Sequence, residues 1–487
     1  MASDQQEGGD VVREAGLLER FHITRTKLGF DSCVVVTAQY NASGVLLNRQ
    51  TLYPALSRVV QANAALSTQV DLGAAPDTKT NAKPPPPRFV RLPVVSLDAV
   101  VSFVSDSALE HLITDEFLRP IEFGTAAPLW RLTVVSGRTL LFAFHHSVGD
   151  GQSGVAFHAA LLHALNHPSE ALHVSGDRVS VSPEAYLVPP IEALTSVSVS
   201  WGKFFSTILG AFLPKFLTKG ASAWTGNDVV SAPSLDTHVS CWEIDADQVT
   251  ELMTLCRKNS TTLTACLHTL VVGVLARLIA TSADRTQRVF KTIATSVPVS
   301  LRRFTGASPH VLCDHIAGVK TYVPISSLAN TSTSDPWFSW AAAARFKERV
   351  QKSMKSTRED IGTLRYLYAL GAGDEFFTGA LGKKRGIALE LSNVGRFPAP
   401  PPGETFIDGE DDAPQQDAQW TLGSVYFAQG DPVSGAALKM NVAGSPTGTV
   451  TVVFSWGEGA LDNEFAEAVI RDTKAALTWV IQSSLIS

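Results

Sequence analysis

The chain has few cysteines for its length, and they follow no pattern. Its 487 residues include five cysteines, none of them spaced as C-x-x-C. An odd, scattered set argues against a disulfide framework and indicates reduced core residues of a cytoplasmic protein. The five are Cys33, Cys241, Cys256, Cys266 and Cys313.

A positive charge excess and long apolar runs are also missing. The 40 basic and 46 acidic residues give a formal net charge of -6, and no Lys/Arg stripe is visible, so we expect no nucleic-acid partner. The acidic N-terminus MASDQQEGGD is typical of neither a secretory signal nor a transit peptide. No run of 18 apolar residues indicates a membrane span.

Several motifs of covalent and nucleotide chemistry are absent from the sequence. It contains neither a G-x-S-x-G nucleophile elbow nor a G-x-x-x-x-G-K-[ST] phosphate loop. The G-x-G at residues 371–373 lacks a preceding strand pattern, so it does not indicate dinucleotide binding. A covalent Ser or Cys nucleophile is therefore not expected, and direct attack by a substrate hydroxyl is the simpler chemistry.

What is present describes a folded protein of two domains. Hydrophobic residues make up 45% and charged residues 18% of a chain too long for one core. We expect domains at residues 1–200 and 236–487, joined by a connecting segment at 201–235. Strand and helix patterns mix in both halves, which predicts two α/β sandwiches side by side.

The spacing of apolar residues predicts helices and strands in both halves of the chain. In the first half we expect helices at 14–26, 47–65 and 152–165, a strand at 33–40, and a hairpin at 128–135 and 139–144. In the second half we expect strands at 237–244, 289–299, 316–325, 387–394, 420–428, 435–443 and 448–456. Its expected helices are 262–280, 336–354, 361–378 and 462–482, and its expected solvated loop is the proline-rich, acidic stretch 397–417.

Residues 201–217 (WGKFFSTILGAFLPKFL) carry aromatic and aliphatic side chains on one helical face, with lysines beside it. Such a helix can cover a core, interrupted near Pro214. It can also lie at a membrane or lipid surface and collect an apolar substrate. Both interpretations stay open, and the second would make a cytoplasmic protein peripheral to a membrane.

The most informative feature is HHSVGDG, residues 145–151. The hairpin strand runs into His145 and His146, and a helix pattern follows the loop. Asp150 occupies the N-cap position, and Gly149 and Gly151 are expected to supply the backbone freedom of a sharp turn. The two histidines are neighbours on an extended segment, so their side chains point to opposite faces.

A histidine with a pKa near 6.5 is largely neutral at pH 7 and can accept a proton from a hydroxyl. His146 is therefore a candidate general base, a role worth about 10²-fold to 10⁴-fold in rate. The alternatives are a structural histidine and a metal ligand shared with Asp150. We expect no metal, because the sequence shows no third ligand group such as H-E-x-x-H.

HHSVGDG also matches the H-H-x-x-x-D-G signature of the coenzyme-A-dependent acyltransferase superfamily, which includes chloramphenicol acetyltransferase, plant BAHD enzymes and condensation domains. The chain resembles its fungal alcohol acetyltransferase branch over most of its length. The similar blocks are GLLERFHITRTKLGFDSCVVVTAQY (16–40), PLWRLTVV with TLLFAFHHSVGDGQSG, TTLTACLHTLVVGVLARL, SVPVSLRRF and ELSNVGRF. The plant-type D-F-G-W-G motif is missing, and the segment most similar to it is FSWGEG (454–459).

The resemblance implies two chloramphenicol-acetyltransferase-like domains with an active-site tunnel between them, in a monomeric protein. Acyl-CoA and a small alcohol would enter from opposite ends and meet at His146, the catalytic base. Asp150 would then point away from the substrate and pair with an arginine, for which Arg302 is the expected partner and Arg303 the competing one. His145 and Gly151 would support the loop.

Further site residues follow from the same resemblance and from local charge. Ser392 or Asn393, in LSNVG, is expected to contact the oxyanion or the acceptor, although Ser-Asn-x-Gly is also good turn chemistry. Lys383, Lys384 and Arg385 form a small basic cluster that can receive coenzyme A phosphates or lie on a solvated loop.

The sequence therefore predicts an O-acyltransferase that moves an acetyl or other short acyl group from acyl-CoA to an alcohol, a natural-product hydroxyl of secondary metabolism. Two alternatives stay open. One keeps the fold but takes the acyl group from a carrier protein, as condensation domains do. The other is a repurposed scaffold with non-acyl chemistry, which the intact motif counts against.

Overall fold

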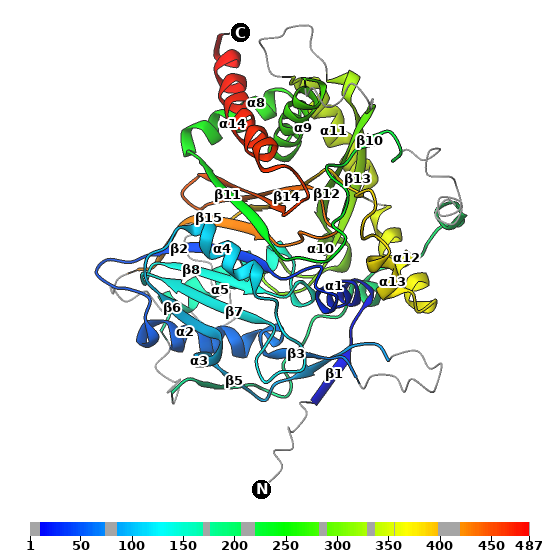
Figure 1. Cartoon of the computed structure of the whole chain (residues 1–487). Coiled ribbons are helices and arrows are strands. Elements are labelled where there is room, and N and C mark those ends of the chain that lie inside the picture. Colours follow the sequence, from blue (N-terminus) through cyan, green and yellow to red (C-terminus); the bar gives the residue numbers. More distant parts are fainter. Residues whose placement is uncertain are drawn as a thin grey trace.

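The computed structural model describes residues 10–73, 85–168, 176–205, 220–281, 290–328, 337–354, 356–397 and 419–486. Within these ranges the chain forms two lobes, each built on one large sheet with helices packed against it (Figure 1). This is the two-lobed α/β architecture that the mixed strand and helix patterns predict. The loop at 397–417 lies outside the described residues except for Phe397.

The first sheet has five described strands in the order β15-β2-β8-β7-β6. Neighbours are antiparallel except for β6 and β7, and the register pairs Val34 of β2 with Phe144 of β8. The strands are β2 (Val34–Asn41), β6 (Val101–Val104), β7 (Trp130–Val135), β8 (Thr139–Phe144) and β15 (Thr421–Gln429). The helices of this lobe are α1 (Leu17–Lys27), α2 (Arg49–Ala62), α3 (Leu97–Val100), α4 (Leu109–Leu118), α5 (Gly151–Asn166) and α6 (Ile191–Leu194).

Short strands and turns complete the first lobe. A three-stranded sheet contains β1 (Asp10–Glu14), β4 (Arg88–Arg91) and β3 (Thr68–Asp71), and β5 (Val94–Ser96) pairs with β9 (Arg178–Ser180). The 3-10 turns η1 (Ala64–Ser67) and η2 (His146–Val148) connect its elements. The turn η2 holds the second motif histidine.

The second sheet is mixed and has seven described strands, in the order β10-β12-β14-β16-β17-β11, with β13 paired to β12. They are β10 (Ala223–Trp224), β11 (Thr237–Ile244), β12 (Thr292–Ser300), β13 (Ile316–Pro324), β14 (Leu389–Arg396), β16 (Leu438–Gly444) and β17 (Val450–Gly457). Its helices are α8 (Ala246–Lys258), α9 (Leu263–Thr281), α10 (Arg302–Thr305), α11 (Trp340–Ser353), α12 (Thr357–Ala369), α13 (Gly373–Thr378) and α14 (Asn463–Ile486), with the turn η5 (Ile325–Ser327).

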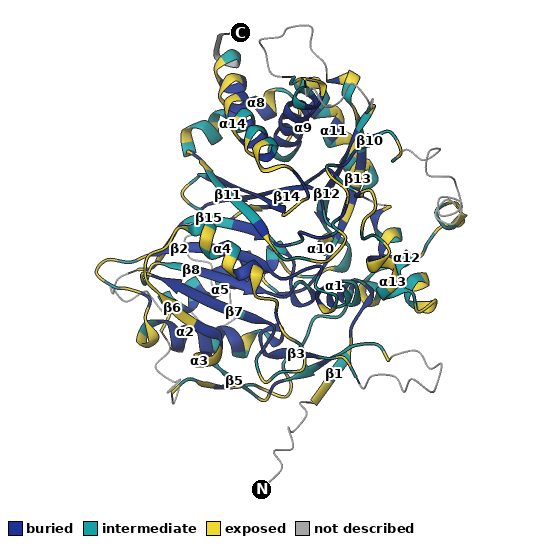
Figure 2. Cartoon of the chain, in the orientation of Figure 1, coloured by how far each residue is buried: buried dark blue, intermediate teal, exposed yellow. Residues whose placement is uncertain are grey.

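The two lobes have separate hydrophobic cores, as the chain length predicts. In the first, Phe142 of β8 stacks on Phe157 of α5 with their ring centroids 3.8 Å apart. The second lies between the second sheet and the helices α8, α9 and α14. Figure 2 shows the strands of both sheets as mostly buried.

Helix α9 is long and apolar enough to cross a membrane by length and composition, but most of it is buried in the second core.

Residues 201–205 at the start of the 201–217 segment are described, and the side chains of Trp201 and Phe205 are exposed. Phe204 packs against Tyr366 of α12. The rest of that segment lies outside the described residues, so the core-covering and the membrane-surface interpretations of it both stay predictions.

The division into residues 1–200 and 236–487 is wrong for one strand. β15 comes from the C-terminal part of the chain but pairs with β2 in the first sheet, where Figure 1 shows it between the two lobes. Likewise β10, in the expected connecting segment, pairs with β12 of the second sheet. The alternation of apolar residues in a strand indicates which face is buried, but it does not indicate which strand pairs with it. Sequence periodicity therefore could not predict either pairing.

Two further helical expectations change. The helix expected at 361–378 is two helices, α12 and α13, because Gly371 adopts a left-handed φ of +71° that ends the first. Helix α8 was not expected, although Asp245 caps it by accepting a hydrogen bond from the Gln248 amide.

Candidate active site

The HHSVGDG loop joins β8 to α5 through the turn η2. Asp150 is the N-cap of α5, and its carboxylate accepts a hydrogen bond from the Ser153 amide at 2.9 Å. The strand therefore ends at Phe144 and the helix begins at Gly151, as the motif predicts. His146 lies between them, where the chain leaves the sheet.

The motif glycines are needed because neighbouring side chains pack closely against them, and not because their backbone conformation is unusual. Gly149 has an extended φ of -170°, and Gly151 is helical, so neither needs the left-handed region. Instead, a Cβ on Gly151 would lie 2.5 Å from Val394 Cγ1 and 2.9 Å from Phe427 Cζ. The expectation of a turn that needs glycine flexibility is thus corrected. Glycine is required at position 151 because side chains of β14 and β15 leave no room for a Cβ at the start of α5.

This close approach gives a testable result. Gly151→Ala is expected to lower the free energy of unfolding by about 1–3 kcal/mol, because Val394 and Phe427 are buried and cannot move away freely. Urea denaturation measures the change. The double variant Gly151→Ala/Val394→Ala frees the space of Cγ1 and should lose less stability than the two single changes summed. Simple additivity would show that the contact is not strained.

The two motif histidines have different surroundings, although both contact α1. His145 is buried, its Nε2 lies 2.9 Å from Thr26 Oγ1, and its Nδ1 lies 2.7 Å from Ser147 Oγ. Burial lowers the pKa of His145 to about 3, so it is a neutral structural side chain. His146 faces a cavity and keeps 12% of its side-chain surface accessible.

Asp150 forms the predicted ion pair with Arg302, whose Nη2 lies 2.9 Å from Asp150 Oδ1. Asp150 is fully buried and points away from the cavity. Burial alone would raise the pKa of Asp150, but the Arg302 guanidinium and the hydrogen bonds from Ser153 lower it, so the carboxylate is charged. Arg303, the competing candidate, is exposed and lies over the Phe304 ring.

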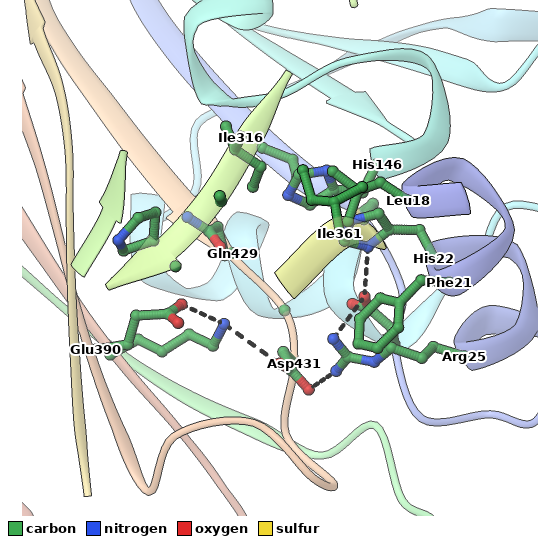
Figure 3. Close-up of a pocket in the computed structure, with 18 of the residues that line it drawn as sticks. Leu18, Phe21, His22, Arg25, His146, Ile316, Ile361, Glu390, Gln429 and Asp431 are labelled. Atoms are coloured by element: carbon green, nitrogen blue, oxygen red, sulfur yellow. Dashed lines mark hydrogen bonds and ion pairs between the residues drawn. The ribbon is translucent and has the colours of Figure 1, made fainter. Parts of the chain in front are cut away.

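A cavity of about 330 Å³ lies beside His146, between α1, α12, β13 and the segment after β15 (Figure 3). Apolar side chains from α1, α12 and β13 cover part of its wall. They are Leu18, Phe21, Ile361, Leu364, Ile316 and Ala317. The cavity is thus bordered by elements from distant parts of the sequence.

A row of alternating charges forms another part of the wall (Figure 3). Arg25 lies 3.8 Å from Asp31 and contacts Asp431, Lys439 lies 3.5 Å from Asp431, and Lys439 also lies 3.1 Å from Glu390. Three acids and two bases leave the row with one excess negative charge. Burial raises the pKa of Asp431 despite its two cationic neighbours.

Two residues that the motif did not indicate lie against His146. The His22 ring of α1 stacks on the His146 ring with centroids 4.0 Å apart and planes 3° from parallel. Asp314, just before β13, places Oδ1 3.5 Å from His146 Nδ1 and Oδ2 3.4 Å from His22 Nε2. Nδ1 of His146 is buried, which leaves Nε2 as the nitrogen available to a substrate.

The sequence carried a signal for His22 but none for Asp314. Leu18, Phe21, His22 and Arg25 follow i, i+3, i+4, i+7 spacing, so two ionisable side chains share an otherwise apolar helical face. Asp314 lies in an irregular segment without a motif. The sequence showed no third ligand-type group, but the structure brings one together: His22, His146 and Asp314 place one nitrogen or oxygen each within 4.8 Å of the others.

Ser392 and Asn393 do not line the cavity, so their expected contact with an oxyanion or acceptor has no support in the geometry. Both belong to β14, and Asn393 donates to Thr264 Oγ1 at 3.1 Å and accepts from the Gly395 amide. Glu390, two residues before Ser392 on the same strand, reaches the cavity instead.

The basic cluster at 383–385 is not a uniform phosphate-binding patch. Arg385 is buried and donates to the carbonyl oxygens of Val433 and Gly435, so its expected contact with coenzyme A is wrong. The Lys384 ammonium binds the carbonyl oxygens of Gly220 and Ala221 beside a second cavity of about 370 Å³. Lys383 is exposed.

Comparison with known proteins agrees with this geometry. The sequence model of the alcohol acetyltransferase family matches residues 14–448. A probable alcohol acetyltransferase (crmB) from Aspergillus fumigatus is 24% identical over 415 residues, covering 79% of this chain and 82% of that protein. Another (FCK4), from Fusarium pseudograminearum, is 25% identical over 415 residues and 79% of each chain.

Solved structures show the same fold at low identity. The trichothecene 15-O-acetyltransferase TRI3 of Fusarium sporotrichioides superposes with a TM-score of 0.65 at 11% identity, over 96% of this chain and 94% of that one. The condensation domain of the monacolin K polyketide synthase MokA gives 0.60 at 11% identity, over 97% and 98%. The family match spans most of the sequence and the two-lobed fold agrees with it, so the chain belongs to the alcohol acetyltransferase family and is an acyltransferase.

Proposed function

We propose that the protein transfers an acetyl or other short acyl group from acyl-CoA to the hydroxyl of a small natural product, in a ternary complex, with His146 as general base. The observation that carries this proposal is the position of His146. Its Nδ1 is buried against Asp314 while the ring borders a cavity of about 330 Å³. A hydroxyl bound there would meet Nε2.

The proposed chemistry needs one proton acceptor and no covalent enzyme intermediate. His146 Nε2 takes the hydroxyl proton as the alcohol oxygen forms a bond to the thioester carbonyl carbon. When the intermediate collapses, the carbon–sulfur bond breaks. The histidine then returns the proton to the leaving thiolate. The products are an ester and free coenzyme A, and His146 ends neutral as it began.

The cavity wall suggests the kind of acceptor. Apolar side chains of α1, α12 and β13 offer contact to a hydrocarbon skeleton, while the charged row from Arg25 to Glu390 offers hydrogen bonds to further polar groups. A small alcohol with mixed character fits both surfaces. Coenzyme A binding through Lys383 and Lys384 remains a prediction, as do the monomeric state and the cytoplasmic location.

The test is an acyl-transfer assay with the purified full chain. Acetyl-CoA is incubated with a panel of natural-product alcohols, free thiol is followed with a chromogenic disulfide, and esters are identified by mass spectrometry. We expect thiol release only when an accepted alcohol is present. A parallel reaction supplies the same acetyl group on a phosphopantetheinylated carrier protein. Transfer from the carrier alone would replace acyl-CoA as the donor, and no ester from either donor would contradict the proposal.

A further inference from the structure

Asp314 is a buried carboxylate with an unusual set of neighbours. Its side chain is fully buried, and neither oxygen accepts a hydrogen bond from the described part of the chain. The described groups within ion-pair distance are two imidazoles, His146 at 3.5 Å and His22 at 3.4 Å. A buried acid without hydrogen bonds costs stability, so such a group calls for a functional explanation.

The motif aspartate and its helix hold the backbone on both sides of Asp314. The Cys313 carbonyl accepts hydrogen bonds from the Asp150 amide at 3.1 Å and from Ser153 Oγ at 3.0 Å. The His315 amide donates to Asp150 Oδ2 at 3.3 Å. Asp314 is the residue between these two anchors, so the buried ion pair of Asp150 also fixes the position of Asp314.

Resting on the function proposed above, we infer that Asp314 is a positioning residue for His146. Its carboxylate faces Nδ1, which favours the tautomer with the proton on Nδ1 and leaves the Nε2 lone pair directed to the cavity. It also stabilises the imidazolium that forms when His146 takes the hydroxyl proton. Asp314 does not line the cavity, so it acts through His146 and not on the substrate.

His22 completes the arrangement from the other side. Burial and the neighbouring His146 hold the pKa of His22 well below its usual range, so its ring is neutral. A neutral ring stacked at 4.0 Å covers one face of His146 and keeps water from it. His22 Nε2 lies 3.4 Å from Oδ2 of Asp314, so the two imidazoles face the two oxygens of the carboxylate.

A shared metal ion is the competing interpretation of the same three groups. An imidazole binds a metal about 2.1 Å from its nitrogen, and the ion lies close to the ring plane. The His22 and His146 planes are 3° from parallel with centroids 4.0 Å apart, so one ion cannot lie in both planes. The stacked geometry therefore favours the carboxylate–imidazole arrangement.

The arrangement predicts how activity depends on pH. Burial by itself would lower the pKa of His146, but the nearby Asp314 carboxylate, helped by Asp31, raises it. Asp314 is the larger of these two charges, so removing it is expected to lower the pKa of His146. Because the base must be neutral, the acid limb of kcat/KM then moves to lower pH. Other charged or titratable groups also interact with this pair. In the described part of the chain they include His22, His145, Glu19, Asp31, Asp150, Arg302 and Cys313, and Arg25 interacts with His22.

The experiment measures the pH profile of Asp314→Asn in the acetyl-CoA assay. We expect kcat/KM to fall about 10²-fold at pH 7.5, with the KM for acetyl-CoA within about 2-fold and the acid limb at lower pH. His22→Phe keeps a stacked ring without nitrogens and should lose about 10-fold. Asp374→Asn removes an exposed carboxylate and serves as the matched control.

The outcomes separate this inference from the proposed function. If His146→Ala is inactive while Asp314→Asn keeps the wild-type rate and pH profile, Asp314 is not a positioning residue and the proposed function stands. A lower rate with an unshifted acid limb and a lower melting temperature would assign Asp314 a structural role only, and overturn the inference. Stoichiometric metal in the purified protein, with activity lost to a chelator and restored by that metal, would overturn it too.

Discussion

His146→Ala is expected to lower kcat/KM for acyl transfer by about 10²-fold to 10⁴-fold. The variant keeps the cavity but removes its proton acceptor, a contribution of about 3–5 kcal/mol to the barrier. The residual rate would come from bringing donor and acceptor together. Initial rates of thiol release at saturating acetyl-CoA, with ester quantified by mass spectrometry, measure the loss.

The control variant is His111→Ala, because His111 is exposed on α4. It should retain wild-type kinetics. Unfolding curves are recorded for both variants, because the mostly buried His146 ring packs on His22 and lies beside the buried Asp314 carboxylate. An unchanged rate in the His146 variant would remove the general-base role. A collapse of stability would make the kinetic loss uninformative, and His146→Gln then replaces alanine in the same assay.

Asp150→Asn is expected to lower the free energy of unfolding by about 3–5 kcal/mol. The substitution keeps the shape of the side chain but leaves the Arg302 guanidinium buried without a counter-charge. Activity should fall with it, because the same carboxylate holds the segment that carries Asp314. Urea denaturation followed by tryptophan fluorescence, together with kcat/KM, measures both effects.

The pH range of this effect follows from the lowered pKa of Asp150. A carboxyl whose pKa is lower in the folded state stabilises the protein above its unfolded pKa, near 3.9, and loses that stabilisation only as pH falls through the folded value. The difference between wild type and Asp150→Asn should thus be constant from pH 6 to pH 8.

Two controls define the role of Asp150. Asp374→Asn breaks an exposed pair with Lys27 and should cost less than about 1 kcal/mol. The double variant Asp150→Asn/Arg302→Met removes the buried cation as well and should recover part of the stability. A loss of rate in Asp150→Asn with unchanged unfolding would instead assign Asp150 a direct part in catalysis.

Local sequence patterns predicted the elements that carry the motif. The strand expected at 237–244 is β11, and the hairpin and the helix after HHSVGDG appear as β7, β8 and α5. These features depend on neighbours in the sequence, so the sequence contains what is needed to predict them.

Patterns of the same kind failed where the answer depended on packing. The basic cluster at 383–385 looks solvated, but Arg385 is buried because carbonyl oxygens of the segment after β15 surround its guanidinium. Ser392 and Asn393 lie in the strand expected at 387–394, but the pairing of β14 with β16 leaves them outside the cavity wall. The need for glycine at position 151 is explained by the close approach of Val394 and Phe427. A pattern along the sequence does not contain contacts between distant segments.

The sequence by itself determined the two-lobed α/β class, the acyltransferase family and the residue at the centre of the site, His146. Short-range spacing sufficed there, since the motif residues are neighbours in one loop. Only the tertiary structure decided what surrounds that histidine. His22 and Asp314 come from two distant segments, α1 and the chain just before β13, and both lie against the His146 ring. Asp431, just after β15, lines the same cavity as His146. Such contacts are set by how whole elements pack.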